Sequence, residues 1–349
     1  VSTGFLLPGV QSNAINGTIT NAFNYSNEVI NIGGNDTMVS WVGLAGIALL
    51  AIIIIGGVNR LGKTAEYIVP FMAGAYIIMA LIIIGLNFTQ IPAVFSMICS
   101  SAFSLDASFG GIVGMAIAWG VKRGIYSNEA GQGTGPHAAA AAEVSHPAQQ
   151  GLVQAFSVYV DTLFVCTATA LMILFTNQFN VVEKFNLKGE VESHIVNHVP
   201  HIGVEGFTQA AVSSHFPSFG SQFVAIALFF FAFTTIMAYY YFAETNIAYI
   251  FKGKKIKPII WILRIVFLFS VYYGTIKTAK SAWDLGDIGV GMMAWVNLIA
   301  IILLSKTGMK VWKDYENQRK QGIEAPNFDP KKRGIKNADF WEENNTDKL

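Results

Sequence analysis

Long apolar runs are the feature that most limits what this chain can fold into. The run GLAGIALLAIIIIGG carries no charge, and several similar runs follow it. A helix needs about 20 mainly apolar residues to cross the hydrocarbon core of a bilayer. Only 13% of the residues are charged, whereas soluble domains carry about 25%. The sequence therefore predicts an all-α integral membrane protein and excludes a soluble enzyme.

The apolar runs predict about eight membrane spans. They cover residues 1–17, 40–57, 67–86, 109–131, 150–176, 222–249, 257–275 and 284–305. Segment 91–104 is short and contains Pro92, so we interpret it as an interfacial or re-entrant piece. The runs are too long and too uniform for the alternating pattern of a membrane β-barrel.

Lys and Arg alternate between the two sides of these spans, which predicts the orientation. One side carries Arg60, Lys63, Lys252, Lys254, Lys255, Lys257 and the basic residues from Lys306 to Lys348. The other side carries only Lys184, Lys188, Lys277 and Lys280. We therefore expect a multi-pass protein of the cell membrane whose tail, residues 306–349, is a solvated cytoplasmic extension. The net charge of +1 gives no signal for nucleic-acid binding.

Segment 109–135 is the least regular of the predicted spans. About ten mostly apolar residues lead to Gly120, and Lys122 and Arg123 follow at once. A charge at mid-bilayer costs about 2.5–3.5 kcal/mol. We predict that the helix breaks at Gly120 and that the freed backbone groups bind ions and carboxylates. The alternative is a helix that ends at Gly120, with Lys122 and Arg123 on the cytoplasmic side.

Two hydroxyl groups, those of Thr234 and Thr235, fall at the centre of span 222–249. Na⁺ is a hard cation that prefers oxygen ligands, so these hydroxyls could complete a sodium site. The alternative is that each hydroxyl bonds to a carbonyl of its own helix.

Other polar side chains inside apolar segments also have two interpretations. Gln11, Ser12 and Asn13 could bind a small polar solute or cap a helix. Asp161 is either functional or hydrogen-bonded to a neighbouring helix. Glu244 could reach the interface or form an inner gate.

The loop 177–221 holds several histidines. His194, His198 and His201 would share one face of a helix, although Pro200 interrupts it, and His215 follows. A zinc site is a minor hypothesis here. We expect residues 203–220 to form a helical cap over the outer side.

One long motif carries a family resemblance. It reads GVKRGIYSNEAGQGTGPHAAAAAEVSHPAQQGLVQAFSVYVDTLFVCTATALMIL, and AFTTI, YYYFAE and WDLGDI follow it. This pattern resembles the alanine or glycine:cation symporter family. The resemblance implies symport of a small neutral amino acid, such as alanine or glycine, by alternating access. Na⁺, or else H⁺, would be the coupling ion, and no cofactor or enzymatic activity is expected.

The resemblance also implies a fold, the five-plus-five inverted repeat of LeuT-like transporters. Residues 1–86 would be the third to fifth core helices, and 87–108 an external interfacial segment. Residues 109–305 would form the second repeat. The first two core helices would be absent, which suggests a fragment of a longer protein.

Site residues follow from the matching positions of the family. The substrate would contact Gln11, Trp119, Gly120, Lys122, Trp283 and Asp287. The two tryptophans would wall the pocket and limit the size of the substrate side chain. Na⁺ would take the carbonyl of Phe231 and the hydroxyls of Thr234 and Thr235. Gating or structural roles would fall to Asn128, Glu129, Asp161 and Glu244.

Two other classes of protein are alternatives to a symporter. A proton-translocating subunit of a respiratory or antiporter-like complex also places Lys, Glu and His in the membrane, but its charges recur along a mid-membrane line. The charges of this chain cluster at one segment instead. An integral-membrane enzyme would need a metal-ligand pattern or a Ser/His/Asp set, which the predicted spans do not contain.

Overall fold

A computed structural model describes most of the chain. The described residues are 1–32, 35–56, 58–102, 109–140, 142–185, 191–199, 206–251, 256–338 and 341–342. They divide into two compact units. Unit 1 comprises residues 1–122 and 163–290, and unit 2 comprises residues 123–162 and 291–349.

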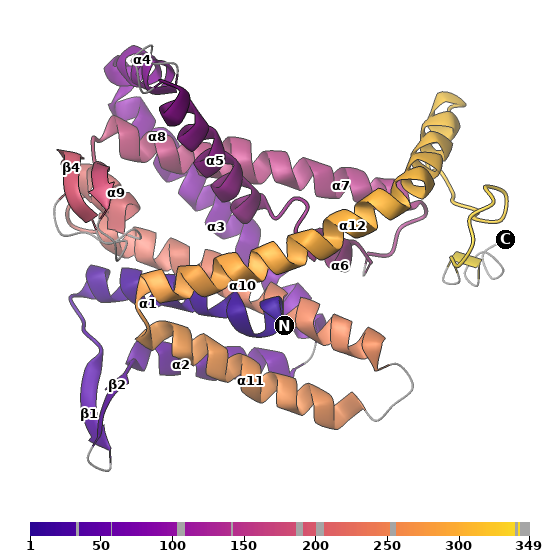
Figure 1. Ribbon diagram of the computed structural model, residues 1–349, viewed down its shortest axis with the longest axis horizontal. Coiled ribbons are helices and arrows are strands. Elements are labelled where there is room, and N and C mark those ends of the chain that lie inside the picture. Colours follow the sequence, from indigo (N-terminus) through magenta and orange to yellow (C-terminus); the bar gives the residue numbers. More distant parts are fainter. Residues whose placement is uncertain are drawn as a thin grey trace. The chain divides into compact units, whose positions relative to one another are not determined.

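Helices dominate the described part of the chain (Figure 1). In the first half they are η1 (Ser2–Leu6), α1 (Pro8–Phe23), α2 (Trp41–Ile55), α3 (Val58–Leu86), η2 (Phe88–Gln90), α4 (Ile91–Ala102), α5 (Phe109–Asn128) and α6 (Thr134–Ala140). Then follow α7 (Pro147–Tyr159), η3 (Val160–Cys166), α8 (Thr167–Phe175), α9 (Gly206–His215), α10 (Gly220–Ile250), α11 (Ile256–Ile276) and α12 (Ala279–Lys320). Both η1 and η3 are π-helical, whereas η2 is a 3₁₀ turn.

Five of the described helical segments are long and apolar enough to cross a membrane. They are Gly62–Leu86, Pro147–Phe175, Gly220–Ile250, Ile256–Ile276 and Ala279–Lys320. These segments confirm a mainly helical, multi-pass membrane protein. Helices also form at the predicted spans 1–17 and 40–57, but α2 has only 15 residues. At about 1.5 Å per residue it rises about 22 Å, less than the hydrocarbon core of about 30 Å.

In unit 1, α1 packs along α10 and α11, and α2 packs on α11 (Figure 1). The crossing of α1 and α11 is close because glycines meet there. A Cβ added to Gly274 would overlap the side chain of Ser12 and the backbone of Gly9. A separate apolar core joins α3, α8, α9 and α10. Its fully buried members include Ile83, Met172 and Val212.

Two antiparallel hairpins accompany the helices. Strand β1 (Glu28–Ile32) pairs with β2 (Asn35–Val39), and β3 (Asn180–Phe185) pairs with β4 (Val191–Asn197). Both hairpins lie in the connections between apolar runs. The apolar runs, from which the helices were predicted, give no information about these connections.

Unit 2 contains α6, α7, most of α12 and the C-terminal residues. The helix α12 continues past the predicted end of its span to Lys320. The chain then folds back, and Phe328 is only 3% exposed. The expectation of a solvated extension is therefore wrong at Phe328, although residues 321–325 are exposed.

Candidate functional site

An ion pair joins α5 to α12 within unit 1. The Lys122 Nζ lies 2.7 Å from the Asp287 Oδ2. The sequence expectation placed both residues at one substrate site, and the structure does bring them together. Each charge neutralises the other, which lowers the cost of holding them in an apolar layer.

Each helix adds a tryptophan on the same side as its charge. Trp119 precedes Lys122 by three residues, and the ammonium lies 5.2 Å from the centre of its ring. Trp283 precedes Asp287 by four residues, a spacing that places two side chains on one helix face. The arrangement therefore offers a cation, an anion and flat apolar surfaces together.

The predicted break at Gly120 is wrong. The helix α5 runs without interruption from Phe109 to Asn128. A Cβ at Gly120 would meet nothing within 4 Å, so no close contact requires a glycine there. The chain leaves the helix at Glu129, whose φ is 57°, and Gly131 and Gly133 follow with φ of 80° and 100°. The break lies in the SNEAGQG turn instead.

Within unit 2, a side chain of α12 fixes this turn. The Asn297 Nδ2 donates to the Gly131 carbonyl at 2.9 Å. A Cβ at Gly133 would lie 3.2 Å from the Asn297 Cβ. Gln132 is 1% exposed and its Nε2 donates to the Ile125 carbonyl at 2.6 Å. Asn297 was not among the predicted site residues, although an amide within the apolar run AWVNLIAI is a signal that could have identified it.

Asp161 and its neighbours form a polar cluster, also in unit 2. The Ser127 hydroxyl donates to the Asp161 Oδ2 at 2.8 Å, and the Asn128 Nδ2 donates to the Thr162 Oγ1 at 2.8 Å. Asp161 lies in the π-helical segment η3. Such segments occur often at functional sites. These contacts support the structural alternative for Asp161 and Asn128 and leave a gating role a prediction.

The hydroxyls of α10 bond to their own helix. The Phe231 carbonyl accepts from Thr234 Oγ1 at 3.0 Å and from Thr235 Oγ1 at 2.9 Å. Both hydroxyls therefore bond to a carbonyl of their own helix, as the alternative interpretation predicts. The same hydrogen bonds bring together the three oxygens of the predicted sodium site, and each hydroxyl keeps lone pairs that can bind a cation.

Three polar residues of the apolar segments near the chain start have different surroundings. The Asn13 Nδ2 donates to the carbonyls of Gly274 and Lys277, at 3.0 and 2.7 Å, and so caps the end of α11. Ser12 bonds back to the Gly9 carbonyl. Gln11 is half-buried on α1. The hydrogen bonds of the described residues do not connect Gln11 to the ion pair, so its substrate role stays a prediction.

Glu244 lies one turn after Tyr240 on α10. The Arg264 Nε donates to the Tyr240 hydroxyl at 3.0 Å. Tyr240 lies on α10 and Arg264 on α11, and both helices belong to unit 1. The gating role of Glu244 stays a prediction.

The helical arrangement that the zinc hypothesis assumed for the histidines is wrong. Residues 191–197 form a strand, so His194 and His198 do not have helical spacing. The His198 Nδ1 bonds to the Asn177 carbonyl at 2.8 Å, and the His215 Nε2 to Asn87 at 3.0 Å. Among the described residues no group of three metal-binding side chains occurs. His201 lies outside the described residues, whereas α9 confirms a helix in the predicted cap.

Ionisable side chains held within apolar helices are typical of proteins that move solutes or ions across membranes. Membrane transporters are therefore the class that this fold and site define. The chain matches the sodium:alanine symporter family over residues 1–330. It belongs to that family, which is a family of transporters and not of enzymes, with Na⁺ as the coupling ion.

Curated relatives agree with this assignment. The Bacillus subtilis protein YrbD carries the provisional name of a sodium/proton-dependent alanine carrier and is 57% identical over 99% of this chain and 68% of its own length. A sodium/proton-dependent alanine carrier protein of Bacillus sp. (strain PS3) is 54% identical over 98% of this chain and 73% of its own length. The sodium/alanine symporter AgcS of Methanococcus maripaludis is 36% identical over 77% of this chain and 55% of its own length.

Proposed function

We propose that this protein carries a small neutral amino acid, such as alanine or glycine, across the cell membrane together with Na⁺ or H⁺. The family and the names of its relatives support a cation-coupled carrier. The observation that carries the proposal for this chain is the ion pair between Lys122 and Asp287, with a tryptophan beside each charge.

A zwitterion is chemically matched to this pair. Its carboxylate would bind the Lys122 ammonium and its ammonium would bind the Asp287 carboxylate. The substrate would thus exchange one neutralising partner for another and leave no charge unpaired. The large rings of Trp119 and Trp283 favour a short substrate side chain. Gln11 completes the proposed substrate contacts, whereas Gly120 lies within the continuous helix α5 and offers no freed backbone group.

The proposed sodium site lies on α10. It consists of the Phe231 carbonyl and the hydroxyls of Thr234 and Thr235, each of which already lies within hydrogen-bonding distance of that carbonyl. Movement of one Na⁺ down a membrane potential supplies about 2.3 kcal/mol per 100 mV. Cation and amino acid are coupled if each favours the conformation that binds the other.

The remaining proposals follow the family pattern. The core would be a five-plus-five inverted repeat that works by alternating access, with a cytoplasmic C-terminus. Asn128, Glu129, Asp161 and Glu244 are proposed as gating or structural groups. The turn that contains Glu129 supports this role, because two glycines with positive φ lie in it.

Transport by the chain in liposomes tests the proposal. We expect an inward Na⁺ gradient to drive accumulation of radiolabelled alanine. Asp287→Asn should weaken alanine binding at least tenfold, because it removes the carboxylate that would bind the substrate ammonium. Asp284→Asn is the matched control, since Asp284 pairs with Lys280 on the same helix but both side chains are 61% exposed.

Equal loss in both variants would refute the proposed site. Proton conduction without alanine transport would refute symport and favour the alternative, a proton-translocating subunit.

A further inference from the structure

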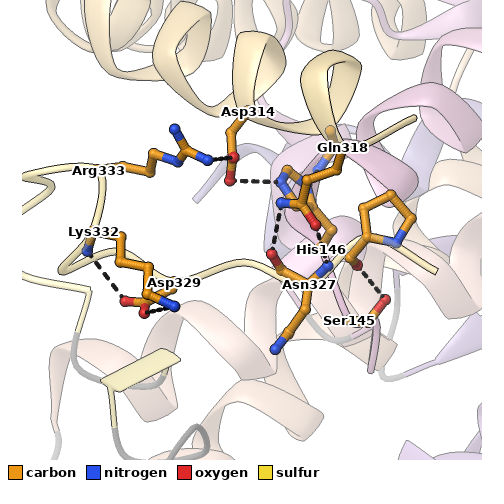
Figure 2. A network of polar contacts seen from close by, with 10 residues as sticks. Ser145, His146, Asp314, Gln318, Asn327, Asp329, Lys332 and Arg333 are labelled. Carbon is orange, nitrogen blue, oxygen red and sulfur yellow. Dashed lines mark hydrogen bonds and ion pairs between the residues drawn. The ribbon is translucent and has the colours of Figure 1, made fainter. Parts of the chain in front are cut away.

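The residues that follow α12 dock on a defined surface of unit 2 (Figure 2). We call residues 323–335 the tail segment. The Gln318 side chain exchanges two hydrogen bonds with the backbone of Asn327, at 2.8 and 2.9 Å. The Ser145 hydroxyl donates to the Pro326 carbonyl at 2.9 Å, and the Phe328 amide donates to the Ser145 carbonyl at 3.1 Å. The tail segment is thus hydrogen-bonded both to α12 and to the loop before α7.

A buried charge lies beside these contacts. Asp314 of α12 is only 2% exposed. One of its carboxylate oxygens binds the guanidinium of Arg333, and the other lies 3.5 Å from the His146 Nε2 (Figure 2). Removal of one partner from a buried ion pair is strongly destabilising, because the remaining charge is left uncompensated. Arg333 is therefore the residue of the tail segment that supplies the counter-charge for the buried Asp314.

His146 has a defined protonation pattern in this arrangement. Its ring is fully buried, and its Nδ1 accepts the Ala148 amide at 3.1 Å as the N-cap of α7. The other nitrogen, Nε2, therefore carries the proton in the neutral ring and faces Asp314.

Aromatic rings cover the histidine. The ring of Phe328 lies 5.3 Å from that of His146 at an angle of 70°, and the ring of Tyr315 lies 5.1 Å away. Phe328 also meets Trp341 edge to face, with ring centres 5.4 Å apart. Phe328 is the apolar anchor of the tail segment, as Arg333 is its charged anchor.

We propose that Ser145, His146, Asp314, Tyr315 and Gln318 form a docking surface whose occupant is the chain's own tail segment, and that acid releases this segment. Docking joins the N-terminal end of α7 to α12. Release separates the N-terminal end of α7 from α12 and exposes Asp314 to water. The proposal does not depend on the substrate or the coupling ion.

Acid acts through His146. Among the residues that the structure describes, the charged and titratable groups that face it are Asp314 and Tyr315 of α12 and Arg333, which reaches it through Asp314. Protonation would place a hydrogen on Nδ1, where the Ala148 amide already donates, and would remove the N-cap. Burial lowers the pKa of His146, and Asp314 opposes this effect only in part.

The sign of the pH dependence follows. The docked state binds fewer protons than the released state, in which His146 has its ordinary pKa of 6.5. Docking is therefore favoured above that value and weakens as the pH falls below it.

Hydrogen exchange on the whole chain in nanodiscs tests the proposal. We expect Asp314→Asn and Arg333→Gln to lower the protection factors of amides 327–329 and 331–333 at least tenfold at pH 7.5. Lys332→Gln should leave them unchanged, because Lys332 is 80% exposed and pairs with Asp329. Amides of α10 provide an internal reference for correct folding. Unchanged protection in Asp314→Asn or Arg333→Gln would overturn the docking surface.

A second comparison tests the response to acid. Protection of the same amides, corrected for intrinsic exchange, should fall between pH 7.5 and pH 5.5 in the native chain. His146→Asn keeps an N-cap acceptor but cannot be protonated, so its protection should not change over this range. An identical fall in both proteins would overturn the role of His146.

Discussion

The crossing of α1 and α11 gives the sharpest stability prediction. The two helices meet at Gly9 and Gly274, but the space beside the two glycines differs. A Cβ at Gly274 would overlap the Ser12 hydroxyl and the carbonyl and Cα of Gly9. A Cβ at Gly9 would lie 3.6 Å from the Gly274 Cα, which is ordinary contact. The same substitution should therefore have opposite effects at the two positions.

The magnitude follows from the overlapping atoms. Overpacking costs about 1–3 kcal/mol, and Gly274→Ala belongs at the upper end because two of the three overlapped atoms are backbone. Replacement of a helical glycine by alanine returns about 1 kcal/mol. The expected net loss is about 2 kcal/mol. At about 2–4 °C per kcal/mol, the Tm should fall by about 4–8 °C. Gly9→Ala should leave the Tm equal or slightly higher.

Thermal unfolding of both variants in the same detergent, followed by tryptophan fluorescence, measures the difference. A Tm of Gly274→Ala within 1 °C of that of Gly9→Ala would refute the close crossing.

Two further predictions concern single hydroxyl groups. Thr235→Ala should raise the Na⁺ concentration that half-maximal alanine uptake requires, whereas Thr235→Ser keeps the hydroxyl and should not; equal Na⁺ dependence in all three proteins would remove Thr235 from the sodium site. Ser40 is fully buried, accepts the Gly43 amide at 2.9 Å and donates to Asn16 Oδ1 at 2.7 Å. Ser40→Ala should cost about 1–2 kcal/mol through loss of this N-cap, and a Tm equal to that of the native chain would contradict it.

The long helices were predictable because each depends on a local property. An apolar run of bilayer length must form an internally hydrogen-bonded helix whatever surrounds it. The predicted spans 222–249 and 257–275 accordingly match Gly220–Ile250 and Ile256–Ile276 closely. The hairpins were missed because they lie in polar connections, where that argument does not apply.

The helix break was placed at the wrong glycine. Gly120 followed an apolar run and preceded two cations, so the hydropathy pattern favoured it. Hydropathy does not report backbone conformation, and φ is positive at Gly131 and Gly133 instead. The turn sequence NEAGQG, with glycines two residues apart, was the better local signal.

The candidate site was predictable only in part. The meeting of Lys122 and Asp287 followed from the family resemblance and not from spacing, since 165 positions separate them. The docked tail segment was not predictable at all. Its contacts join residues 145–146 to residues 326–328 and Asp314 to Arg333, and no local pattern links these segments.

The length of α12 has a mechanical consequence. From Ser305, the predicted end of the apolar span, the helix rises about 14 Å to Asp314 at about 1.5 Å per residue. A tilt of about 10° relative to α7 would displace that carboxylate by about 2 Å, more than the range of about 0.5 Å over which N–H···O distances vary. The projecting end of α12 therefore amplifies small rotations inside the bilayer into the breaking or making of contacts in the water beyond it.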